Sequence, residues 1–141
     1  MNQQRDTVPT TGFQNLSRIL LGLFMVIAGI GHLSFSRAEF QAQVPDWVPL
    51  TKDTVVILSG IVELLFGLCL IFLVKYKVFI GWLLAFFFIA VFPGNLHQYT
   101  AGIDGFTLDT DNKRFVRLFF QPVLIAWALW STGAWRAWRR R

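Results

Sequence analysis

The feature that most limits the fold is an apolar run of twenty-one residues, Thr54 to Val74, that contains one charged residue, Glu63. A helix of about 20 apolar residues crosses the roughly 30 Å hydrocarbon core of a bilayer, so the run predicts a membrane span. A carboxylate in hydrocarbon costs roughly 2.5–3.5 kcal/mol on insertion scales and therefore faces a bundle interior. Gly60 and Gly67 share the helical face of Glu63, and small residues there allow a second helix to approach closely. We expect the other helices to pack around Glu63.

Three more apolar segments predict an all-α, integral membrane four-helix bundle. The 141 residues are 55% hydrophobic and 15% charged, which leaves no room for a second domain. A polar N-terminal tail is expected at 1–15 and a basic C-terminal tail at 138–141, with a cleaved signal peptide as the rival interpretation of the first span. The membrane domain is expected at 16–137, with its spans at about 16–33, 54–74, 78–99 and 115–137.

The basic residues orient this predicted bundle. With both termini in the cytoplasm, eight Lys and Arg residues lie on the inner side and five on the outer side, in agreement with the positive-inside rule. The net charge of +5 therefore reflects membrane topology, and no basic face with interleaved aromatic residues indicates a nucleic-acid partner. The single cysteine, Cys69, excludes an intrachain disulfide and a C-x-x-C redox pair.

Polar side chains from all four predicted spans converge in the outer half of the bundle. One interpretation is a structural network in which Glu63 pairs with Arg117, and His32 and Gln121 complete the hydrogen bonds. The other is a pocket for a small polar or quinone-like molecule, in which Glu63 is the candidate catalytic residue because a carboxylate can carry a proton to a bound carbonyl. The residues predicted to line this pocket are His32, Trp47, Glu63, Phe92, Asn95, Arg117 and Gln121.

Metal and haem fit the sequence less well than a quinone does. His32, His97 and Glu63 include no pair with metal-ligand spacing within one helix, so no metal site is expected. A haem would need His32 and His97 to face each other, and His97 lies off the polar stripe of its span. The cofactor is therefore left unknown, with quinone ahead of haem.

Several short motifs resemble the DoxX family of small four-helix membrane proteins. They cover about residues 16–135 in the family's order and spacing. The motifs are Leu21-Gly22, Ala28-Gly29-Ile30-Gly31-His32, Val44-Pro45-x-Trp47-x-Pro49, Ser59-Gly60-x-x-Glu63-x-x-x-Gly67, Val91-Phe92-Pro93-Gly94-Asn95 and Arg117-Leu118-x-x-Gln121.

This resemblance implies a multi-pass protein of the bacterial inner (plasma) membrane. The family includes a subunit linked to thiosulfate:quinone oxidoreductase and members associated with redox complexes or disulfide formation, and it is similar to eukaryotic assembly chaperones for membrane receptors. We therefore expect a subunit or accessory of a quinone-linked redox system, with a membrane or periplasmic redox protein as partner. A non-enzymatic assembly or stability factor and a small-molecule transporter are the alternatives. Whether the chain is itself an oxidoreductase, and whether it forms homo-oligomers, stays open.

Overall fold

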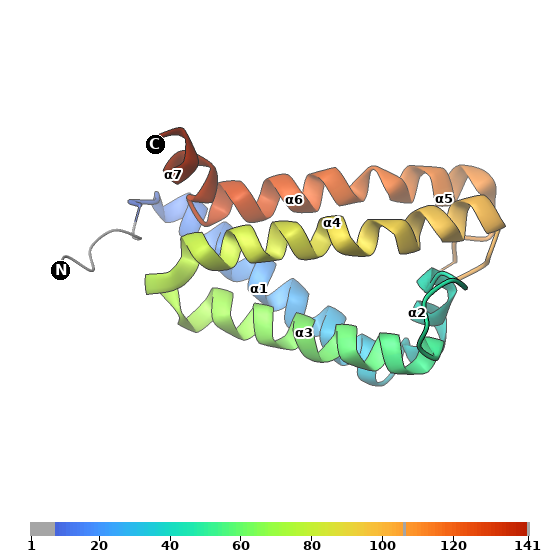
Figure 1. Ribbon diagram of the computed structural model, residues 1–141. Coiled ribbons are helices and arrows are strands. Elements are labelled where there is room, and N and C mark those ends of the chain that lie inside the picture. Colours follow the sequence, from blue (N-terminus) through green and yellow to red (C-terminus); the bar gives the residue numbers. More distant parts are fainter. Residues whose placement is uncertain (1–7, 106, 141) are drawn as a thin grey trace.

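The computed structural model describes residues 8–105 and 107–140, and this part of the chain is all-helical, without strands. Four long helical segments run side by side, and short helices lie at both ends of the bundle (Figure 1). In chain order the elements are α1 (Gly12–Leu33), α2 (Arg37–Phe40), the 3-10 turn η2 (Gln41–Gln43), α3 (Lys52–Phe72), the 3-10 turn η3 (Val74–Tyr76), α4 (Lys77–Ala101), α5 (Asp111–Leu118), α6 (Phe120–Ser131) and α7 (Ala134–Arg139).

Helices α1 and α3 form the first closely packed pair. A Cβ atom added to Gly67 would lie 2.6 Å from the Gly22 carbonyl oxygen, and one added to Gly29 would lie 2.8 Å from the Gly60 carbonyl oxygen. Two backbones can approach this closely only where neither helix carries a side chain. The small-residue face expected around Glu63 is therefore the α1 contact of α3.

Helix α4 forms the second pair with α5 and α6, which lie in line along it (Figure 1). The segment predicted as a span at about 115–137 is divided in the structure, because the regular helix is interrupted at Phe119 and ends at Ser131. Pro122 has no amide to donate to the Leu118 carbonyl, which accounts for the first break. Gly133 adopts a left-handed φ of 77°, which accounts for the second.

The other long helices differ from the expected spans only at their ends. Helix α1 starts at Gly12, because Thr11 accepts a hydrogen bond from the Gln14 amide in a capping box, so the expected tail is helical from that point. Residues 1–7 of that tail and Arg141 lie outside the described residues. Helix α3 starts at Lys52 with Thr51 as its cap, and α4 continues through Pro93 to Ala101.

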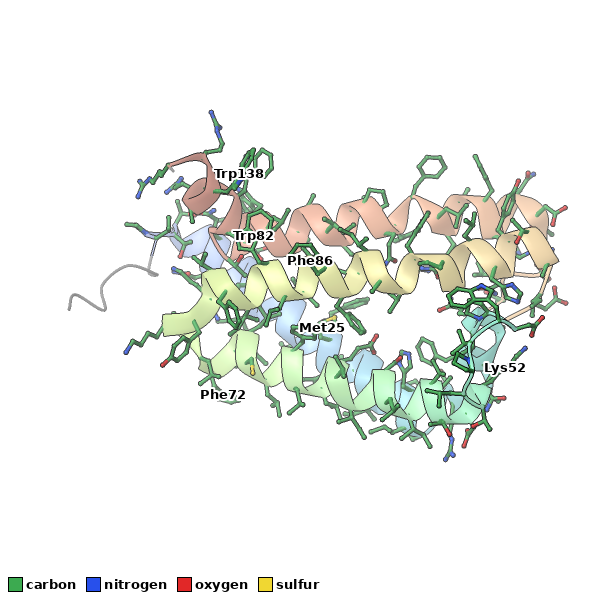
Figure 2. All side chains as sticks on the ribbon, viewed as in Figure 1. Met25, Lys52, Phe72, Trp82, Phe86 and Trp138 are labelled. Carbon is green, nitrogen blue, oxygen red and sulfur yellow. The ribbon has the colours of Figure 1, made fainter. Side chains whose placement is uncertain are left out.

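Three of the helical segments are long and apolar enough to cross a membrane: Gly12–Leu33, Lys52–Phe72 and Val74–Ala101. Their interior faces meet in a core that includes Leu21, Met25 and Leu84. Their outer faces carry large apolar side chains, as expected for helices surrounded by lipid. Figure 2 shows Met25 between the helix pairs and Phe72, which is 72% exposed, pointing away from them.

Helix α2 and the 41–51 segment cover the end of the bundle that is remote from α7 (Figure 1). Arg37 holds α2 against α3 through a two-point contact with Asp53, and its Nε–Oδ1 distance is 2.6 Å. On the other side, Gln43 Nε2 donates to Gln98 Oε1 of α4 at 3.2 Å. Gly94 of α4 is essential to this contact, because an added Cβ would lie 2.1 Å from the Gln43 carbonyl oxygen.

Candidate functional site

A cavity of about 680 Å³ separates the two helix pairs in the half of the bundle capped by α2. The pairs diverge there, and the space between them is enclosed by α1, α3, α4, the α5–α6 segment and the loop after α2. Ligand pockets of small molecules have volumes of about 300–1,000 Å³, so the cavity has the size of a binding site. The site is built from its two walls, each contributed by one helix pair.

Six of the seven residues predicted from the sequence line this cavity. They are His32, Trp47, Glu63, Asn95, Arg117 and Gln121. Phe92 does not line it, so that expectation is wrong. Successive helical residues are 100° apart, and α4 faces the cavity through Val91, Gly94 and Asn95, which turns the ring of Phe92 away.

His32 and Glu63 form the polar centre of the α1–α3 wall. The Nδ1 atom of His32 lies 2.9 Å from Glu63 Oε2 and 2.8 Å from the Ala28 carbonyl oxygen. Both neighbours are hydrogen-bond acceptors, so Nδ1 carries the hydrogen, which is directed at the carbonyl. Glu63 Oε2 is consequently buried without a donor among the described residues.

The expected ion pair between Glu63 and Arg117 is not formed. Glu63 is on the α1–α3 wall beside His32, whereas Arg117 is on the α5 wall across the cavity. The guanidinium of Arg117 lies over the Phe120 ring, with Cζ 5.8 Å from the centroid. Its Nη1 is buried and has no hydrogen-bond acceptor in the described part of the chain. The two charges therefore face a common space from opposite sides.

Asn95 and Gln121 complete the wall formed by α4 and α6. Asn95 Nδ2 donates to Gln121 Oε1 at 3.2 Å, and Gln121 Nε2 donates to the Phe88 carbonyl oxygen at 2.6 Å. Pro93 has no amide hydrogen to donate to the Ile89 carbonyl, so the helix lacks one backbone hydrogen bond at this turn. Gln121 binds the carbonyl of the preceding residue, Phe88, and so supports the weakened turn. Asn95 is only 5% exposed, and its Oδ1 is left without a donor among the described residues.

The segment with Trp47 closes the cavity at the α2 end of the bundle. Asp46 accepts an ion-pair contact from Lys52 Nζ at 3.0 Å, and this hydrogen bond lowers the pKa of the Asp46 carboxyl. His97 lies near the same carboxylate, with Nε2 3.9 Å from Asp46 Oδ2, and does not line the cavity. The two histidines are therefore in different surroundings, and no group of three His, Cys, Asp or Glu residues suited to a metal occurs among the described residues.

Sequence reasoning missed two residues that shape the site. Phe40 stacks on the His32 ring, with centroids 3.3 Å apart and planes 17° apart, and fixes one face of the imidazole. Gln43 lines the cavity where its backbone touches Gly94. Both lie in the segment between α1 and α3, where no helical periodicity indicates which side chain faces inward. The glycine at position 94 was the available signal, because a glycine inside a helix often marks a close approach.

The cavity has an apolar opening between α1 and the α5–α6 segment. Nearer the termini this gap is closed, because the indole of Trp127 donates to the Ser17 Oγ at 2.8 Å. Towards α2, the lining side chains Phe24, Ile27 and Phe120 are 46%, 61% and 55% exposed. A cavity lined mainly by apolar side chains, with a few polar groups on its walls and an apolar opening, suits a ligand that has a polar head and an apolar tail.

The described residues form an all-helical protein with three helices long and apolar enough to cross a membrane and with a ligand-sized space between two helix pairs. Residues 21–132 match the family described as a domain of unknown function (DUF8561), and the chain belongs to this family. No curated protein and no solved structure matches the chain.

Proposed function

We propose that this protein binds a quinone-like amphiphile in the cavity, as a subunit or accessory of a redox system in the bacterial inner membrane. The single observation that carries the proposal is the set of unsatisfied polar atoms on facing walls. Glu63 Oε2 and Asn95 Oδ1 are acceptors, and Arg117 Nη1 is a donor. A hydroquinone ring, with an oxygen at each end, satisfies both walls, because one oxygen accepts from Arg117 and the hydroxyl at the other end donates to Glu63.

In this proposal the chain spans the membrane four times, with both termini in the cytoplasm. Three helices meet the length and apolarity of a span, and the broken α5–α6 segment runs back along α4 as the fourth. Interruptions of a helix at membrane depth are tolerated where they line a cavity, and Gln121, next to Pro122, lines this one. The DoxX resemblance of the motifs that carry His32, Glu63 and Asn95 supports the same placement.

Reduction of a quinone to a hydroquinone takes up two electrons and two protons. Glu63, whose Oε2 lies 2.9 Å from His32 Nδ1, is proposed to deliver one proton to the ring oxygen nearest the α1–α3 wall, and water supplies the second proton to the other ring oxygen. The electrons come from a partner redox protein in the membrane or the periplasm. The apolar opening beside Phe24 and Ile27 admits the ligand tail from the surrounding lipid.

The proposal is tested by titrating the purified protein with two quinones that share a ring and differ in the presence of an isoprenoid tail. Binding is followed by fluorescence quenching of Trp47, which lines the cavity, with a Trp47→Phe variant to isolate its signal. Saturable binding of one tailed quinone per chain, weakened in Arg117→Gln, is the expected result. Absence of saturable binding by either compound contradicts the proposal and favours an assembly factor whose polar core is only structural.

A further inference from the structure

A second cavity, of about 350 Å³, lies at the opposite end of the bundle, where α1 begins and α7 ends. It is formed because Gly133 turns the chain from α6 into α7, which folds back over the start of α1 (Figure 1). The residues that line it are Gln14, Trp130, Gly133, Trp135, Arg136, Arg139 and Arg140.

Three arginines therefore surround one small cavity. Arg136 is held in place because its Nη1 donates to the Pro9 carbonyl oxygen at 3.0 Å. Arg139 and Arg140 are exposed and have no hydrogen-bond or ion-pair partner in the described part of the chain. A guanidinium presents a rigid fork of donors that matches two oxygens of a phosphate.

Among the described residues, no carboxylate lies near these arginines. Seven of the eight Asp and Glu residues are described; six lie in the loops or helix starts at the far end of the bundle, and the seventh is Glu63 within α3. Tryptophan side chains, here Trp130 and Trp135, favour the headgroup level of a bilayer. The cavity thus combines phosphate-binding donors with interfacial aromatic residues.

We infer that this end of the bundle binds the phosphate of an anionic phospholipid headgroup, with Arg139 and Arg140 as its main ligands and Gln14 at the base of the site. Basic pockets on the cytoplasmic side of membrane helices recognise such headgroups. The inference rests on the proposed placement of the chain in a membrane and is independent of which ligand occupies the larger cavity.

The test uses the full-length protein in a neutral detergent, with phosphatidylglycerol or phosphatidylcholine added in equal amounts. Thermal unfolding is expected to show a larger stabilisation by phosphatidylglycerol. In the double variant Arg139→Lys/Arg140→Lys, which keeps the net charge, the selective affinity should fall roughly tenfold because the guanidinium forks are lost. The control Lys75→Gln removes a charge at the same end of the bundle but outside the cavity, and should retain the selectivity.

Three results would overturn the inference. Equal stabilisation by the two lipids would show that no anionic headgroup is recognised. Wild-type selectivity in the lysine variant would show that charge alone acts. Full replacement of the effect by inorganic phosphate would show that the site takes a free anion and not a lipid. Quinone titration of the same variants tests the larger cavity separately, because these substitutions should leave quinone affinity unchanged.

Discussion

At the scale of single residues, Glu63 distinguishes a binding site from a structural network. Its side chain is 13% exposed, and its Oε2 lacks a donor among the described residues even though His32 Nδ1 lies 2.9 Å away. A carboxylate used only for packing would have its acceptors satisfied by the bundle. The unsatisfied oxygen faces the cavity, which is where a ligand hydroxyl is proposed to lie.

We predict that Glu63→Gln weakens binding of a tailed quinone on the order of tenfold or more, because a hydrogen bond to a charged group contributes about 1.5–3 kcal/mol. The thermal unfolding midpoint without ligand should change little. Both quantities are measured on one detergent preparation. Glu39→Gln is the control, because Glu39 is in α2 and does not line the cavity. Unchanged binding with a loss of about 3–5 kcal/mol in stability would instead indicate a structural pair.

The contact between Asp46 and Lys52, next to Trp47, should contribute less to the stability of the protein at acidic pH. The hydrogen bond from Lys52 lowers the pKa of Asp46 in the folded protein, so the ionised carboxyl stabilises the fold above the ordinary Asp pKa of about 3.9. This contribution is lost as the pH falls through the lowered pKa. We predict that the unfolding midpoint of the wild type exceeds that of Asp46→Asn by a small margin at about pH 6 to 7 and that the margin closes as the pH falls below the ordinary Asp pKa of about 3.9. A margin that widens towards acid would contradict this assignment.

At the scale of elements, the α1–α3 contact determines where the cavity can form. The two helices are in contact through glycine backbones along their length, so the divergence of the bundle occurs between the pairs and not within this one. An added methyl group at Gly67 would meet the Gly22 carbonyl at 2.6 Å and the Val26 amide at 2.9 Å, and neither backbone atom can move independently.

Gly67→Ala should therefore destabilise the protein by about 1–3 kcal/mol, the usual cost of overpacking. Gly12→Ala is the matched control, because nothing lies within 4 Å of a Cβ at that position. Equilibrium unfolding in a denaturing detergent measures both. Equal stability of the two variants would mean that the helices are further apart than the structure has them.

The sequence predicts long apolar elements better than it predicts their interruptions. The lengths of the apolar runs locate α1, α3 and α4 to within a few residues, because only a continuous apolar helix of this length crosses the hydrocarbon core of a bilayer. The break at Phe119 depends on a backbone bond that Pro122 cannot make, and a proline near the start of a span is also compatible with a straight helix. Burial of Glu63 is predictable from its cost in lipid. Its position beside His32, and not beside Arg117, depends on how the two helix pairs diverge, and no local sequence pattern indicates that divergence.

At the scale of the whole molecule, the charges are separated along the bundle. All described acidic residues except Glu63 lie at or near the α2 end, and α7 with its arginines lies at the other. Figure 2 shows Lys52 and Trp138 at these opposite ends. A bundle with this distribution is expected to cross the membrane with α7 in the cytoplasm.

We predict that single cysteines introduced in a Cys69→Ser background report this orientation. Asp109→Cys, in the loop before α5, should react with a membrane-impermeant thiol reagent in intact spheroplasts. Arg140→Cys should react only after permeabilisation. Reaction of Arg140→Cys from outside would contradict four spans with cytoplasmic termini.

The central claim, that the larger cavity holds an amphipathic ring ligand, is tested most directly by identifying what co-purifies with the protein. Ser59 lines the cavity, whereas its neighbour Leu58 is 50% exposed and does not line it, so Ser59→Phe and Leu58→Phe form a matched pair. Mass spectrometry of lipid extracts should find about one quinone-like molecule per chain in the wild type and Leu58→Phe, and a large loss in Ser59→Phe. An empty wild-type protein, or a quinone content unchanged by Ser59→Phe, would contradict the claim.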